Sequence, residues 1–287
     1  MRRTAAGLLV ALTAACGATP SPAAAPSSSA PSSSAPVETA LPAVPGLEAE
    51  AVRLRTDEAI GGQFQVRITD TGDDAFTVTS VALDSPGFTA LPATAETAEF
   101  APGRVIDLPT PYGAPVCDAE PLPAAAQLIV VRPDGAQEAV RAPLSADVLQ
   151  LIHDEKCAVL AVAEVVDVVV TDMADAGDSL AGSLTLTRRE GDEPVTAATL
   201  GRSVLVDVVA EDLPLELAGE ERSARTDVSF TSATCDPHVL SETKKPFVFP
   251  LTVQVGDDDP VTMDLPLDQV ARDRLAALVQ RVCAVGG

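Results

Sequence analysis

Apolar and polar residues alternate along most of the chain after about residue 46. Phe64, Val66 and Ile68 fall on one face of such a run, and the stretch 247–255 alternates in the same way. Runs of this kind, rich in β-branched residues and bounded by Gly, Pro and Asp clusters, are typical of strands joined by hairpins. About seven such strands fit into each stretch of about 115 residues, which is the density of a β-sandwich.

Two segments replace the alternation with helical spacing. In the first, Ser145 stands where a helix cap is expected, followed by Val148, Leu151 and Ile152; in the second, Asp268 stands at the same point. The stripe of the second segment contains five apolar residues: Val270, Leu275, Leu278, Val279 and Val282. Each segment leads into a cysteine, so the pattern predicts a short helix that ends at a cysteine in both places.

Cysteines also mark an internal repeat. Cys117 and Cys235 each precede an aspartate and lie 118 residues apart, whereas Cys157 and Cys283 each precede an alanine and lie 126 residues apart. The difference predicts a net insertion of eight residues between the two cysteines of the second copy.

A third echo relates residues 81–86 to residues 209–214. Because the three echoes keep their order, they predict a duplicated domain, with one copy at 47–161 and the other at 162–287. The alternative is a pair of unrelated β-domains with similar composition.

The N-terminus has the composition of an export signal. Two arginines precede a short apolar run that ends at Ala15, and Cys16 follows. The segment Leu12-Thr13-Ala14-Ala15-Cys16 resembles the lipobox of bacterial lipoproteins, although Thr13 stands where that family usually has Leu. The resemblance implies that residues 1–15 are a signal peptide and that Cys16 carries a lipid. An ordinary secretory signal that contains a cysteine is the alternative.

The next segment, 16–46, has no apolar period. Residues 17–46 contain seven Pro, seven Ser and eight Ala, including the consecutive repeats Ser-Ser-Ser-Ala-Pro at 27–31 and 32–36. Such a sequence buries too little apolar surface to offset the entropy of ordering, so it predicts a lipid-anchored, disordered tether.

Cysteine arithmetic agrees with an exported protein. Removing Cys16 from the five cysteines leaves an even four, for which disulfides are the default outside the cytoplasm. Of the three possible connectivities, pairing Cys117 with Cys157 and Cys235 with Cys283 keeps each bridge inside one copy. The predicted fold is therefore all-β: two tandem immunoglobulin-like β-sandwich domains, each ending in a short α-helix stapled by a disulfide.

Composition narrows the chemistry. A formal charge of −23 disfavours nucleic-acid binding, which needs clustered Lys and Arg. The chain has no Gly-x-Ser-x-Gly elbow, and its two histidines, His153 and His238, fall in different copies and are interpreted as surface or cap residues. Cys235 and His238 have the spacing of metal ligands, but a disulfide is the better use of Cys235. The sequence thus predicts no catalytic residue, no cofactor and no metal ligand.

Calcium is the one metal with any candidate positions. Asp257, Asp258 and Asp259 form the strongest acidic turn, and oxygen ligands in sandwich loops can bind this ion. The alternative, that acidic turns only keep the protein soluble, is favoured. The same two interpretations apply to the other acidic turns: Asp70, Asp73 and Asp74; Asp172, Asp175 and Asp178.

These features lead to a functional hypothesis. The signal and tether resemble those of uncharacterised lipoproteins from high-GC Gram-positive bacteria, which implies a lipid-anchored position on the outer face of the cell membrane. There the protein is expected to bind or scaffold an envelope protein or wall polymer without catalysis. One alternative is an enzyme, or enzyme accessory, that acts on wall polymers through carboxylates. Another, solute capture for a transporter, fits the all-β pattern poorly.

Overall fold

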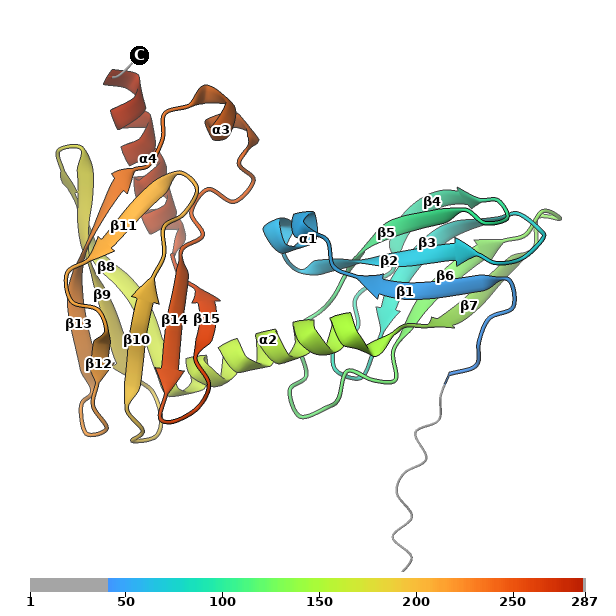
Figure 1. Cartoon of the computed structure of the whole chain (residues 1–287), viewed down its shortest axis with the longest axis horizontal. Coiled ribbons are helices and arrows are strands. Elements are labelled where there is room, and N and C mark those ends of the chain that lie inside the picture. Colours follow the sequence, from blue (N-terminus) through green and yellow to red (C-terminus); the bar gives the residue numbers. More distant parts are fainter. Residues whose placement is uncertain (1–40, 286–287) are drawn as a thin grey trace, which may run out of the picture. The chain divides into compact units, whose positions relative to one another are not determined.

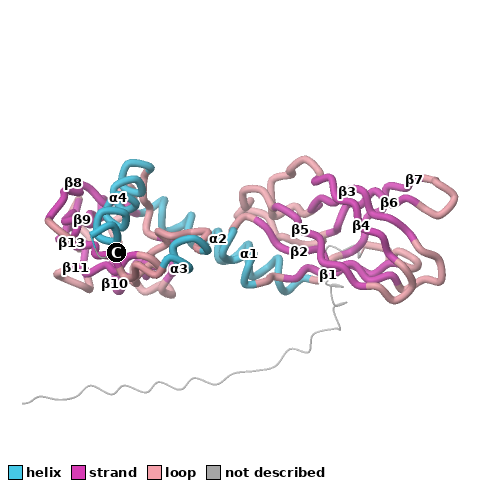
Figure 2. Tube along the Cα trace, turned by 90° about the horizontal axis from the view of Figure 1, so that it is seen from above, coloured by secondary structure: helices cyan, strands magenta, loops and turns pink. Residues whose placement is uncertain are grey.

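The computed structural model describes residues 41–285. Strands are the commonest secondary structure in this part of the chain, and the helices are four separate segments (Figure 2). None of the described helices is both long and apolar enough to cross a membrane. The predicted signal peptide, the lipidation site Cys16 and nearly all of the predicted tether lie outside the described residues.

The first β-sandwich has seven strands in two antiparallel sheets (Figure 1). The three-stranded sheet has the order β1-β2-β5, and the four-stranded sheet has the order β4-β3-β6-β7. The strands are β1 (Leu47–Val52), β2 (Gln63–Asp70), β3 (Phe76–Asp84), β4 (Thr94–Phe100), β5 (Val105–Pro111), β6 (Ala125–Val131) and β7 (Gln137–Pro143).

The alternation seen in the sequence accounts for the core of this sandwich. Phe64, Val66 and Ile68 on β2 are fully buried, as are Val78 on β3 and Val130 on β6. Successive side chains of a strand point to opposite faces, so every second residue of these strands meets the facing sheet.

The second β-sandwich has eight strands, again in two antiparallel sheets. Their orders are β11-β13-β9-β8 and β12-β10-β14-β15. The strands are β8 (Val166–Ala176), β9 (Ser179–Arg188), β10 (Val195–Leu200), β11 (Val206–Ala210), β12 (Leu215–Leu217), β13 (Ser223–Ser232), β14 (Pro250–Val255) and β15 (Val261–Asp264).

The two sandwiches share a pairing scheme. The ladder β1-β2-β5 corresponds to β8-β9-β13, and β3-β6-β7 corresponds to β10-β14-β15. Helix α3 (Pro237–Glu242) lies between Cys235 and β14, where the sequence predicts extra residues. The third echo is wrong as a structural equivalence, because residues 81–84 belong to β3 whereas 209–210 belong to β11, which pairs with β13.

Each sandwich is followed by a helix that carries a disulfide. Helix α2 (Ala146–Val165) holds Cys157, bonded to Cys117, and α4 (Gln269–Val285) holds Cys283, bonded to Cys235. The all-β fold and this pairing are confirmed. The expected short helices are wrong in length, because they span 20 and 17 residues and both continue past the cysteine.

The extension of α2 changes the relation between the two copies. The predicted boundary at 161/162 falls inside this helix, which runs directly into β8. Leu149 and Ile152 belong to the core of the first sandwich, whereas Val162 belongs to the core of the second. One helix thus contributes apolar side chains to both cores, because its stripe of apolar residues continues beyond Cys157.

The helix caps differ between the copies. Asp268 accepts a hydrogen bond from the backbone N–H of Ala271 (2.7 Å) at the start of α4, as its position predicts. Ser145 stands at the N-cap of α2, but its side chain makes no capping hydrogen bond, so that part of the prediction is wrong.

Candidate functional site

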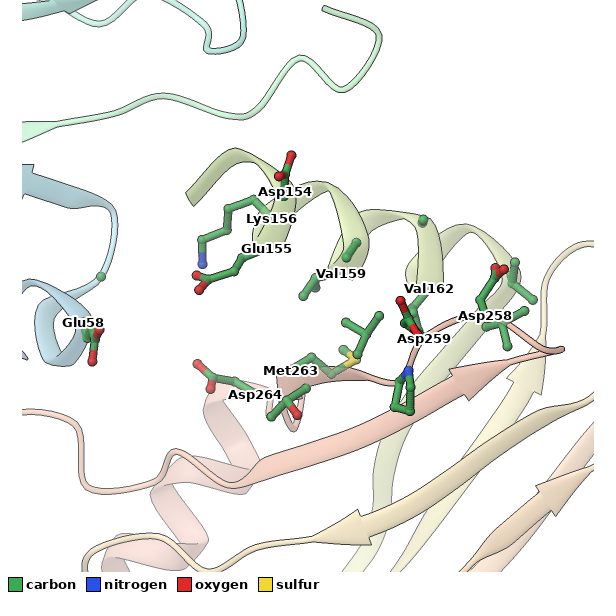
Figure 3. Close-up of a pocket in the computed structure, with 18 of the residues that line it drawn as sticks. Glu58, Asp154, Glu155, Lys156, Val159, Val162, Asp258, Asp259, Met263 and Asp264 are labelled. Atoms are coloured by element: carbon green, nitrogen blue, oxygen red, sulfur yellow. The ribbon is translucent and has the colours of Figure 1, made fainter. Parts of the chain in front are cut away.

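A groove of about 940 Å³ lies beside helix α2. It lies within the compact unit that contains both sandwiches. Its walls come from α2, from the β14–β15 hairpin, and from the short helix α1 (Arg55–Ile60) with its flanking residues (Figure 3). The volume is at the upper end of the range for small-ligand sites, about 300–1,000 Å³.

The centre of the groove is apolar. Val159 and Val162 of α2 face Met263 of β15 (Figure 3). The helix residues recur at helical spacing, and Val261 and Met263 alternate with the exposed Thr262 and Asp264 along the strand. The two periodicities therefore bring one apolar stripe from each element to the same space.

Carboxylates lie towards the ends of this apolar centre. Glu155, Glu58 and Asp264 lie at one end, and Asp258 and Asp259 lie at the other (Figure 3). All five residues are exposed, so their carboxylates keep most of their hydration. Within residues 41–285, no basic side chain lies within ion-pairing distance of Asp258, Asp259 or Asp264.

Three basic side chains also line the groove. Arg53 Nη1 donates to both carboxylate oxygens of Glu155 (2.9 and 2.8 Å), and its Nε lies 3.6 Å from Glu58. Lys245 lies against α1, since a Cβ added at Gly61 would be 2.7 Å from its Nζ. Lys156 follows Glu155 on the exposed side of α2. Carboxylates outnumber these cations, eight to three, so the groove is net acidic.

A buried carboxylate fixes the wall formed by α1. Asp57 is only 1% exposed, and its side chain accepts hydrogen bonds from the Leu54 backbone N–H (2.9 Å) and from the amides of Gln63 (2.8 Å) and Gln65 (2.5 Å). These donors compensate for desolvation of the carboxylate. Asp57 therefore ties α1 to β2, and its hydrogen bonds are directed inward.

One ionisable group outside the groove has a shifted pKa. Arg67 on β2 donates to Asp107 on β5 through Nε (2.7 Å) and Nη2 (2.9 Å), and this hydrogen bond, with the charge of Asp107, raises the pKa of Arg67. An arginine is charged at any physiological pH, so the pair is a cross-strand link.

The two histidines lie in separate sandwiches. His153 is 6% exposed, with its Nε2 3.1 Å from the Val116 carbonyl oxygen and its ring edge-on to Phe88. Interpreting His153 as a surface residue was therefore wrong, because α2 turns this position towards the end of the sandwich. His238 is exposed, as expected of a surface residue, and its backbone N–H donates to the side chain of Asp236, the N-cap of α3.

The acidic turns considered as calcium sites do not bring their carboxylates together. Among the described residues, no three His, Cys, Asp or Glu side chains gather closely enough to hold a metal ion. Asp70 is buried and accepts from the Gly72 N–H (2.9 Å), which shapes its turn, and Asp172 pairs with Arg225 (3.3 Å). The turn Asp257 to Asp259 presents two of its carboxylates to the groove.

Sequence reasoning did not find the groove. Asp258 and Asp259 were recognised only as an acidic turn, and the wall opposite them was not anticipated. The available signal was the stripe Ala158, Ala161, Val162 and Val165, which continues the helix past Cys157.

Comparison with known proteins identifies no relative in sequence, since no family model and no curated protein matches this chain. Three solved structures are similar at low levels. They are red sea bream transglutaminase (11% identity, 79% of this chain and 32% of that chain, TM-score 0.24), the YadV chaperone (12%, 77% and 98%, 0.21) and a protein of unknown function from Porphyromonas gingivalis W83 (13%, 77% and 100%, 0.19). The chain spans about a third of the length of the transglutaminase. Structural similarity at these TM-scores says nothing about the function of this chain.

Proposed function

We propose that this protein is a lipid-anchored binding module on the outer face of the cell membrane, and that it recognises another envelope component through the groove beside α2. The observation that carries the proposal is the combination of an apolar centre with carboxylates at both ends. The export signal, the cysteine at its end and the Pro-, Ser- and Ala-rich tether support the location.

A photo-crosslinking experiment in intact cells tests the binding role. A photoreactive residue replaces Thr262, an exposed threonine on the edge strand β15 that lines the groove. The matched control places it at Thr97, an exposed threonine on the edge strand β4 of the first sandwich. We expect Thr262, but not Thr97, to crosslink reproducibly to one envelope component. Equal crosslinking from both positions, or none from Thr262, would contradict a binding role for the groove.

The anchor has a separate test. We expect Cys16→Ser to release the protein from the membrane fraction into the medium, because a lipid attached to Cys16 is the proposed membrane contact. Ser27→Ala, in the tether, serves as the control and should leave the membrane fraction unchanged. Retention of the Cys16→Ser protein in the membrane would contradict lipid anchoring.

Catalysis on wall polymers is the second candidate, and carboxylates on facing walls, such as Glu155 and Asp264, are the observation that favours it. Binding is preferred because Tyr112 is the one aromatic residue among those that line the described groove, which leaves little surface for stacking sugar rings. Incubation with purified cell wall distinguishes the two: release of soluble fragments that Asp264→Asn abolishes would establish catalysis.

A further inference from the structure

We infer that the groove accepts a basic segment of a protein partner, in which an apolar side chain is flanked by two Lys or Arg residues. This inference rests on the proposed binding function and specifies the chemistry of the partner. It commits to a protein segment because the groove is too small for a folded domain and offers both apolar and ionic contacts.

The apolar centre supplies the first element of recognition. Val162 is 4% exposed, and Val159, Val261 and Met263 are half-buried, so packing already restricts these side chains. An apolar side chain placed between α2 and β15 would leave water at little entropic cost to the protein. Met263 can adjust to the shape of that side chain, because methionine is unbranched and flexible.

The unpaired carboxylates supply the second element. Asp258 and Asp259 lie at one end of the centre, and Asp264 lies at the other (Figure 3). Glu155 and Glu58 already pair with Arg53. Lys156 and Lys245 offset part of the negative charge of the groove. At the end of the groove where Glu155 lies, Asp264 is therefore the carboxylate that we expect to pair with a cation of the ligand. Two acidic ends separated by an apolar centre are complementary to two cations separated by an apolar group.

The spacing of the strand gives the length of the segment. Asp259 and Asp264 are five residues apart along a stretch that ends with β15, so their backbones are at most about 16 Å apart at about 3.3 Å per residue. An extended peptide with cations at its first and fifth residues spans about 13 Å, and the length of the lysine side chains covers the difference. Alternate residues share a face, so its third residue points the same way as the cations. The fitting pattern is therefore basic-x-apolar-x-basic.

Fluorescence anisotropy with labelled peptides tests the pattern on the full chain held in detergent micelles. The probe contains Lys-Ala-Leu-Ala-Lys, and the comparison peptides contain Glu-Ala-Leu-Ala-Glu and Lys-Ala-Ser-Ala-Lys. The test variant combines Asp258→Asn, Asp259→Asn and Asp264→Asn, which are exposed positions. The control variant makes the same change in charge outside the groove through Asp73→Asn, Asp74→Asn and Glu120→Gln.

We expect the first peptide to bind, and the test variant to weaken binding by about tenfold while the control variant changes it less than twofold. The Glu peptide should not bind, the Ser peptide should bind more weakly, and added salt should weaken binding further. The inference is overturned if neither Lys peptide binds, if both variants weaken binding equally, or if the Glu peptide binds as well as the Lys peptide.

Crosslinking separates this inference from the proposed function. A groove that still crosslinks from Thr262 after the Asp258, Asp259 and Asp264 replacements would keep the binding role and overturn the basic segment. Loss of that crosslink in the test variant, but not in the control variant, supports both. A crosslinked component that is a wall polymer or a second copy of this chain would overturn the inference while leaving a binding function in place.

Discussion

At the scale of single residues, the buried carboxylate of Asp57 depends on its three hydrogen-bond donors to offset its desolvation. Replacing Asp57 with Ala would leave the Leu54 N–H and the Gln63 and Gln65 amides without their acceptor. We expect Asp57→Ala to lower the free energy of unfolding of the first sandwich by about 2–4 kcal/mol, because unpaired buried donors retain their desolvation cost.

Tyrosine fluorescence during urea unfolding measures this effect. Tyr112 is the only tyrosine of a chain without Trp, and it packs beside Phe88 in the first sandwich, so its signal reports on that domain. Glu58→Ala is the matched control on the same helix, since Glu58 is exposed and its nearest ion pair spans 3.6 Å. A shift for Glu58→Ala as large as that for Asp57→Ala would refute the assigned role.

The two histidines form a second matched pair. His153 packs edge-on to Phe88 and contacts the Val116 carbonyl, whereas the His238 side chain is exposed. We expect His153→Ala to destabilise the first sandwich by about 2–3 kcal/mol through lost packing and a lost hydrogen bond, and His238→Ala to cost less than about 0.5 kcal/mol. Calorimetry of both variants checks the difference, and equal losses would contradict it.

The sequence predicted the role of a single residue where that role follows from neighbouring residues or from the repeat. The disulfide partners followed from parity and the repeat, because keeping each bridge within one copy leaves a single connectivity. The burial of His153 could not be predicted, because it depends on where α2 crosses the end of a sandwich. Asp258 and Asp259 were recognised as an acidic turn, but their place at the groove depends on a helix over 90 residues earlier in the chain.

At the scale of elements, the two N-caps allow a prediction across the copies. Asp268 accepts from the Ala271 N–H at 2.7 Å, whereas the Ser145 side chain makes no capping bond. We expect Asp268→Ala to cost about 1 kcal/mol and to speed hydrogen exchange in the first turn of α4. Ser145→Ala should leave exchange in α2 nearly unchanged. Faster exchange after Ser145→Ala, equal to that in α4, would show that Ser145 caps its helix in solution.

Alternation located strands correctly, but it did not fix all of their ends and it did not find every strand. The run that contains Phe64, Val66 and Ile68 lies within β2, as the pattern indicates. The strand predicted for 247–255 begins only at Pro250, because residues 247–249 form the approach to the sheet from α3. The edge strand β8 was missed because its polar residues and its irregular register between Thr171 and Ala174 interrupt the period of two.

At the scale of the whole molecule, helix α2 links the stability of the two sandwiches. Leu149 and Ile152 complete the first core, and Val162 completes the second, with no loop between them. The groove depends on the same continuity, since its helical wall is the segment from Asp154 to Val165. Breaking the helix between the two cores should therefore affect both domains.

Leu160 is the position for this test because its side chain is 45% exposed and lies between the two core segments. We expect Leu160→Pro to destabilise both sandwiches, by about 3 kcal/mol in total, because proline removes a helical hydrogen bond and clashes with the preceding turn. Leu160→Ala is the control for the loss of the side chain and should be nearly neutral. Calorimetry follows both domains while Tyr112 fluorescence isolates the first. If Leu160→Pro shifts only one transition, the two cores are independent and α2 is a linker whose two halves fold separately.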